Sequence, residues 1–97
     1  MLDKIKGLME MQRKMQEVKR QLDAMTFEVK SSDGFVTIAM NGSQQVQYVK
    51  IGGAVPETKT EVLERQFKDT FNAAIRRSHE LAAQKMKDIT GVNIPGV

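Results

Sequence analysis

The sequence predicts a small α+β domain in which a long N-terminal helix, a three-stranded antiparallel meander and a long C-terminal helix follow one another. The apolar residues recur with a period near 3.6 at both ends of the chain and with a period of two between them. Turn-forming residues separate the segments that have the period of two. The chain has 97 residues, which fits one domain, so residues 1–97 are expected to share one core.

The first helix is expected over residues 2–25. Its apolar residues alternate between three- and four-residue spacings, which forms a heptad seam: Leu8, Met11, Met15, Val18, Leu22 and Met25. Glu10 with Lys14 and Glu17 with Gln21 are spaced for stabilising i,i+4 contacts. Methionine adapts to irregular contacts, so the Met-rich seam is interpreted as a self-association surface rather than a cofactor site.

The strands are expected between Met25 and Ile51. Phe27 and Val29 alternate with polar residues in the first strand, and the second strand follows a turn at residues 31–34 and contains Val36, Ile38 and Met40. Asn41-Gly42 predicts a tight hairpin because both residue types tolerate positive φ.

The third strand is expected from Gln45 to Ile51. Its apolar residues change phase between Tyr48 and Val49, which predicts a bulge or a sheet edge there. We expect Val36, Ile38 and Val49 to be buried, because they lie on the apolar side of the alternation.

The second helix is expected after the break at residues 52–56. Thr58 and Glu61 have the spacing of a capping box, Gly91 is a suitable C-terminal cap, and Pro95 prevents continuation. Such a helix has about 30 residues and is about 45 Å long. Its expected core arc comprises Leu63, Phe67, Thr70, Phe71, Ala74, Ser78, Leu81, Ala82 and Ile89.

Several functional classes are disfavoured by composition. The chain has no Cys and a single His, His79, so neither a thiolate nor a multi-histidine metal site is expected. No nucleophile, base and orienting group stand in a recognisable pattern. The apolar runs are too short for a membrane span, and charges from Asp3 onward disfavour a signal peptide. We therefore expect a cytoplasmic, non-enzymatic protein without a cofactor, small-molecule substrate or membrane partner.

Basic residues line the predicted first helix on the side opposite the seam. Lys6, Arg13 and Arg20 recur every seven residues, with Lys14 and Lys19 beside them. Such a row can follow the phosphates of DNA or RNA, because their neutralisation releases counterions. The alternative is a solvated helix face, since the neighbouring acidic residues balance much of the charge: Asp3, Glu10, Glu17 and Asp23.

A second polar stripe lies on the predicted C-terminal helix, opposite Phe67 and Phe71. Its members are Arg65, Lys68, Asn72, Arg76 and His79. Arginine suits bidentate contact with phosphate, and asparagine can bond a phosphate or a base edge. A solvated face is again the alternative, because Glu61 and Glu64 dilute the positive charge near the start of the helix.

Four stretches together resemble the YbaB/EbfC family. They are Met9–Gln16, Gly34–Gly42, Phe71–Arg77 and Met86–Gly91 with its continuation to Gly96. The resemblance covers nearly the whole chain in the right order. Ala73 departs from the family's common Asp, Thr70 departs from its common Ala, and the first helix begins without the Gly-rich lead of many members.

The resemblance implies a helix–strands–helix subunit, a homodimer with projecting helical arms, and DNA binding in the bacterial nucleoid. Arg76 and Arg77 match the family's basic positions after the Phe-Asn-Asp-Ala segment. We expect duplex DNA to be the partner, because Phe67, Phe71 and Tyr48 are assigned to the core or sheet and leave no aromatic residue to stack on unpaired bases. The alternative is a prefoldin-like adaptor or holdase whose arms bind protein instead.

Overall fold

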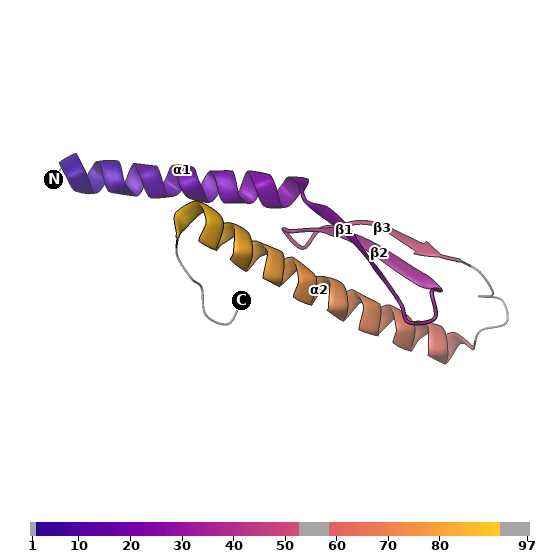
Figure 1. Cartoon of the computed structure of the whole chain (residues 1–97). Coiled ribbons are helices and arrows are strands. Elements are labelled where there is room, and N and C mark those ends of the chain that lie inside the picture. Colours follow the sequence, from indigo (N-terminus) through magenta and orange to yellow (C-terminus); the bar gives the residue numbers. More distant parts are fainter. Residues whose placement is uncertain (1, 53–58, 92–97) are drawn as a thin grey trace.

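Two helices and a three-stranded sheet follow one another along the chain (Figure 1). The structure, a computed structural model, describes residues 2–52 and 59–91. The elements are α1 (Leu2–Ala24), β1 (Thr26–Lys30), β2 (Val36–Asn41), β3 (Val46–Ile51) and α2 (Thr60–Thr90). The sheet is antiparallel in the order β1-β2-β3, so the predicted α+β class and meander are confirmed.

The core lies between one face of the sheet and α2. Val36, Ile38 and Met40 of β2 form a buried cluster with Ala74 of α2. Partly buried apolar residues from β1 and α2 surround this cluster. The far half of α2 also meets the C-terminal half of α1 (Figure 1), where Val18 and Leu22 are buried. The helix α2 therefore joins the sheet to α1.

Ile38→Ala is expected to lower the free energy of unfolding by about 2–4 kcal/mol, since Ile38 is fully buried and the cavity adds to the lost transfer energy. Ile5→Ala is the matched control, because Ile5 is 54% exposed and alanine favours a helix. Denaturant titration at equal protein concentration measures both variants. Equal midpoints for Ile38→Ala and the parent would contradict this core.

The edge strand β3 is more exposed than the sequence predicts. Val49 pairs with Ile38, but its side chain is 41% exposed while that of Ile38 is fully buried. Opposite residues of an antiparallel pair share a face, so Val49 lies on the same side of the sheet as α2. The helix α2 packs mainly on β2 and β1 and leaves Val49 partly uncovered, so the predicted burial of Val49 is wrong.

The strand β3 also contains the irregularity that the phase change predicts. Ala39 pairs with Tyr48, but the next residue, Met40, pairs with Val46, which leaves Gln47 as the extra residue of a bulge. The irregularity therefore precedes the predicted place between Tyr48 and Val49. The predicted edge is confirmed, since β3 has β2 as its one neighbour in the sheet.

The hairpin between β2 and β3 is present, but its geometry differs from the predicted Asn-Gly turn. Within the described residues, positive φ occurs in this hairpin at Gln44 (62°) and at neither Asn41 nor Gly42. Gly42 is required for another reason. A Cβ there would lie 2.7 Å from Cδ2 of Leu22 and 3.2 Å from its main-chain oxygen, so the missing side chain allows α1 to approach the hairpin.

Gly42→Ala is expected to lower the free energy of unfolding by about 1–3 kcal/mol, since overpacking forces neighbouring groups apart. Leu22 Cδ2 can shift, but the main-chain oxygen is held at the end of α1. Gly7→Ala is the control, because a Cβ at Gly7 meets nothing within 4 Å and alanine favours a helix by about 1 kcal/mol. Thermal unfolding of both variants tests the contact, and an unchanged Gly42→Ala protein would refute it.

The second helix has 31 residues, in agreement with the predicted length. The N-cap residue of α2 is Lys59, and its side chain forms no capping hydrogen bond. The predicted capping box, which has Thr58 as the N-cap, is therefore wrong. Thr58, the break at residues 53–56 and Pro95 lie outside the described residues. The predicted cap at Gly91 is confirmed, since its φ is 73° and its N–H donates to the Lys87 carbonyl at 2.8 Å.

The first helix ends one residue before its predicted end and is covered at its C-terminal end alone. Val18 and Leu22 of the predicted seam are buried, whereas Leu8 is 72%, Met11 44% and Met15 41% exposed. The N-terminal half projects past the end of α2 (Figure 1). Half of the predicted seam thus has no cover within the described part of the subunit.

Candidate nucleic-acid interface

All five basic residues predicted on α1 lie at the surface, with Lys14 half-buried and the other four exposed. Three of them pair with a carboxylate on the same helix. Arg13 lies 2.5 Å from Glu10, Arg20 lies 2.5 Å from Glu17, and Lys19 lies 3.2 Å from Asp23. Lys6 and Lys14 form no ion pair with any described residue. The basic row on α1 is therefore partly neutralised.

These carboxylates remain ionised at neutral pH. The hydrogen bond from Arg20, joined by one from Gln21, lowers the pKa of Glu17 to about 2. The hydrogen bond from Arg13 likewise lowers the pKa of Glu10. The predicted support of Glu17 by Gln21 is confirmed at 2.9 Å, whereas Glu10 pairs with Arg13 rather than with Lys14. Exposed pairs of this kind are weak because water and salt screen them, so a phosphate can displace the carboxylate.

The predicted residues on α2 are exposed and mostly unpaired. Within the described part of the chain, Arg65, Lys68 and Arg76 form no ion pair, and Arg77 lies 3.7 Å from Glu80. Asn72 is exposed on the same helix. The axial distance from residue 65 to residue 76 is about 17 Å, so these side chains spread along the helix instead of forming one cluster.

A groove of about 530 Å³ runs between β1 and α2, and Arg76, Arg77 and Lys30 are among its lining residues. Glu28 and Glu80 lie in the same groove, which reduces its positive charge. Sequence reasoning missed Lys30, because this residue joins the basic residues of α2 only when β1 packs beside that helix.

The aromatic rings stay away from the basic row on α1. Tyr48 donates a hydrogen bond to Glu28 across the sheet, which raises the pKa of the tyrosine, and Lys50 lies 4.9 Å from its ring. The rings of Phe67 and Phe71 stack at 6.3 Å. Phe67 is 37% exposed, more than its predicted core position implies, because it lies beside the uncovered strand β3.

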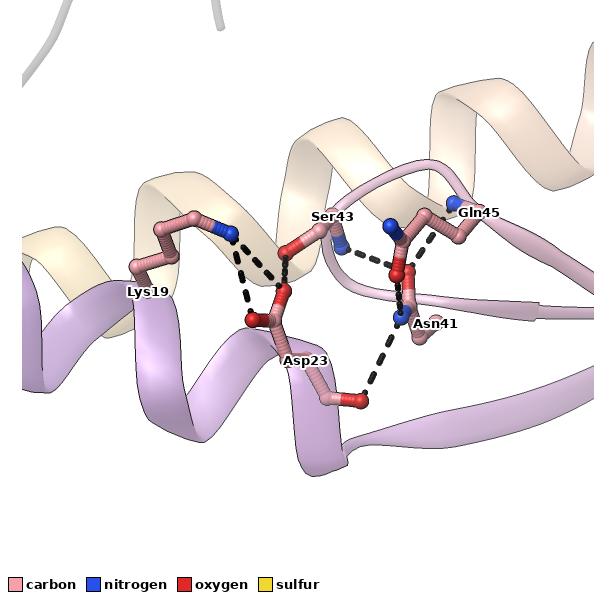
Figure 2. Close-up of polar contacts among 5 residues, drawn as sticks. All are labelled: Lys19, Asp23, Asn41, Ser43 and Gln45. Atoms are coloured by element: carbon pink, nitrogen blue, oxygen red, sulfur yellow. Dashed lines mark hydrogen bonds and ion pairs between the residues drawn. The ribbon is translucent and has the colours of Figure 1, made fainter.

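The hairpin residues Asn41–Gln45, here called the hairpin joint, bond to α1 (Figure 2) and also to α2. Asn41 bonds the end of α1, and its carbonyl accepts a bond from Ser78 of α2. The sequence marked Asn41 as a turn residue and placed Ser78 on the core arc. It gave no signal that the two residues meet, since they are far apart along the chain.

Residues 2–52 and 59–91 contain neither a metal-binding cluster nor a helix of membrane-spanning character. No group of three or more His, Cys, Asp or Glu side chains could hold a metal ion there. No helix in those ranges is long and apolar enough to cross a membrane.

The fold is elongated, with extents of 67 × 23 × 16 Å, and places a small antiparallel sheet between two long helices that carry exposed basic side chains. The chain belongs to the YbaB/EbfC DNA-binding family, whose sequence profile matches residues 1–93. This match confirms the family indicated by the sequence motifs.

Similar proteins come from several bacteria. A nucleoid-associated protein of Legionella pneumophila is 35% identical over 92 residues, which span 94% of this chain and 82% of the relative. A nucleoid-associated protein of Gloeothece citriformis is 35% identical over 104 aligned residues, which span 99% and 91%. The crystal structure of an uncharacterised Helicobacter pylori protein has 18% identity and a TM-score of 0.65, covering 75% of this chain and 86% of that chain; it supports the fold alone.

Proposed function

We propose that this protein is a homodimer that binds duplex DNA, mainly through phosphate contacts from the basic faces of α1 and α2. The family match over residues 1–93 carries this proposal. It favours DNA over the protein partner of a helical adaptor. The names of the relatives extend the proposal to the bacterial nucleoid, with a role in nucleoid organisation or gene regulation.

Phosphate contact is supported by the exposure of the basic residues. Lysine and arginine side chains at a surface reach phosphate oxygens without a preformed pocket. Two copies of each basic face neutralise about 4–8 phosphates, which corresponds to a log–log salt slope of about −4 to −7. The residues proposed to make these contacts are Lys6, Arg13, Lys14, Lys19, Arg20, Arg65, Lys68, Asn72, Arg76 and Arg77.

Duplex DNA is proposed over single strands because the basic row on α1 has no aromatic ring on the same helix. Single-strand binders use such rings as platforms for unpaired bases. In this protein Tyr48 bonds within the sheet and Phe67 packs on Phe71. The sequence of α1 contains no aromatic residue.

Dimerisation is supported by an uncovered apolar surface beside α2, here called the β3 face. Its members and their exposed fractions are Val46 (43%), Val49 (41%), Ile51 (51%) and Phe67 (37%). A contiguous exposed patch of large apolar side chains is typical of an interaction site. We propose that a second copy covers the β3 face in a two-fold, self-complementary contact.

A mobility-shift titration with duplex DNA at several salt concentrations tests the function, with light scattering in parallel. We expect a dimer whose affinity falls steeply with salt, and weaker competition by single-stranded DNA of equal length. No shift at low salt would contradict DNA binding. A shift that does not depend on salt would contradict phosphate contact.

A further inference from the structure

We propose that the hairpin joint, Asn41–Gln45, fixes the angle between α1 and α2, so that both basic faces meet one DNA duplex together. Asn41 and Ser43 are then positioning residues for DNA binding. This inference rests on the proposed function, but its geometric part can be measured without DNA.

The joint is tied to the C-terminal end of α1 by side chains and main chain (Figure 2). The Asn41 amide Nδ2 donates to the Asp23 main-chain carbonyl at 3.2 Å, and the Ser43 hydroxyl donates to the Asp23 carboxylate at 2.5 Å. The Gly42 N–H lies 3.0 Å from the carbonyl oxygens of both Leu22 and Met25. The last carbonyls of a helix lack partners within the helix, so these bonds satisfy the end of α1.

The same residues are tied to α2 through one serine. The Ser78 hydroxyl donates to the Asn41 carbonyl at 3.1 Å and accepts the Gln44 N–H at 3.1 Å. Ser78 is fully buried and Asn41 is 1% exposed. Bonds to both helices therefore meet at the buried residue Asn41, whereas Gln44 and Gln45 of the same turn are exposed.

Asn41 also closes the turn itself. Its side-chain oxygen accepts the N–H groups of Ser43 and Gln45 at 2.9 Å each, and its amide donates a second bond to the Gln45 side chain at 2.8 Å. A buried polar group that is fully bonded in this way holds one geometry, because breaking any bond leaves an unsatisfied group. The turn is thus stiff enough to transmit the position of α2 to α1.

The joint controls the position of the basic residues because α1 is long and its far end lies well away from the joint. The N-terminal half of α1 projects past α2 (Figure 1), and its apolar residues there are exposed. A rotation of about 10° at the joint moves the far end of the 23-residue helix by about 6 Å. This displacement is nearly two of the steps of about 3.4 Å between charges along a DNA strand. Loss of the joint would therefore disturb simultaneous contact by both helices.

The double variant Asn41→Asp, Ser43→Ala removes the two side-chain bonds to α1. The aspartate keeps the acceptor oxygen that closes the turn and removes the donor to Asp23. Gln45→Ala is the matched control, because it removes a partner of Asn41 inside the turn without touching α1. Ser43→Thr is the conservative variant, since it keeps the hydroxyl. Circular dichroism checks that every variant remains folded.

Distances between spin labels at Gln12→Cys and Gln84→Cys report the angle between the helices. The chain has no native Cys, and both positions are exposed. Dilution with unlabelled protein isolates distances within one subunit. We expect a narrow distribution for the parent, Gln45→Ala and Ser43→Thr, and a broad or displaced one for the double variant. If the folded double variant has the same distance distribution as the parent, the hairpin joint does not set the angle between the helices.

DNA binding gives the second readout. We expect the double variant to bind about three- to tenfold more weakly, because it has lost preorganisation, and to show a shallower salt slope, because fewer phosphates are neutralised at once. Partial unfolding alone lowers affinity but leaves the slope unchanged, and that result would overturn the positioning role. If the parent itself fails to bind DNA, the proposed function fails, and the label distances still decide whether the joint sets the angle.

Discussion

Reversing Arg13 and Arg20 to Glu is expected to weaken duplex binding by on the order of 100-fold near physiological salt. The proposed homodimer would carry each reversal twice, so as many as four phosphate contacts are lost, and each contributes about 0.9 to the log–log salt slope. The new carboxylates also repel the phosphates. The proposed dimer is expected to persist, because both side chains are exposed on α1 and neither belongs to the β3 face. Mobility-shift titrations over a salt series measure affinity and slope together.

Removal of the neighbouring carboxylates is a control for this charge reversal, because it should strengthen DNA binding instead of weakening it. Glu10→Gln with Glu17→Gln releases Arg13 and Arg20 from ion pairs of 2.5 Å, so tighter binding and a steeper salt slope are expected. Lower pH is not expected to release Arg20 above about pH 3, since the pKa of Glu17 is about 2 and a carboxylate stays ionised above its pKa.

Arg76→Glu tests whether α2 shares the DNA surface. Within the described residues Arg76 forms no ion pair, so its charge is fully available to phosphate and its reversal should also weaken binding. The adaptor alternative predicts no change in either charge-reversal variant. If both variants remain dimeric and bind duplex DNA like the parent, the arms are not the DNA surface and these residues have been wrongly assigned.

Element order and helix length could be predicted from the sequence, because they follow from local periodicity and turn chemistry. The core arc of α2 is a clear case. Thr70, Ala74 and Ser78 are buried, as their shared angular position on the helix implies. The C-terminal cap at Gly91 could likewise be predicted from the residues around it. These features depend on a few neighbouring residues and require no knowledge of which elements touch.

Features that depend on long-range packing were missed. Val49 has the alternation of a core residue, but its exposure depends on where α2 crosses the sheet. Gly42 has the signature of a positive-φ turn, but its small size matters because Leu22 lies against it. The candidate DNA residues were found from charge and helical spacing. Their ion pairs with Glu10, Glu17 and Asp23 depend on side-chain conformations, which the spacing of residues in the sequence does not determine.

Val49→Glu is expected to convert the proposed homodimer into monomers at tens of micromolar protein. A two-fold contact places the substitution in the interface twice, and burying an unpaired carboxylate in an apolar contact costs several kcal/mol. Because Val49 is already 41% exposed in the single subunit, the monomer has room for the new side chain. Light scattering should give a mass near that of one chain, 10.9 kDa, with unchanged helical circular dichroism.

Two further variants locate the interface. Lys50→Glu adds a carboxylate to the opposite face of β3 and should leave the dimer intact. Met11→Glu places it on the uncovered seam of α1, where Met11 is 44% exposed. If Met11→Glu yields monomers and Val49→Glu does not, the seam is the interface and the β3 face is wrongly assigned. If Val49→Glu alone dissociates the dimer, its DNA affinity should also fall and its salt slope should roughly halve, because a monomer presents half the cations.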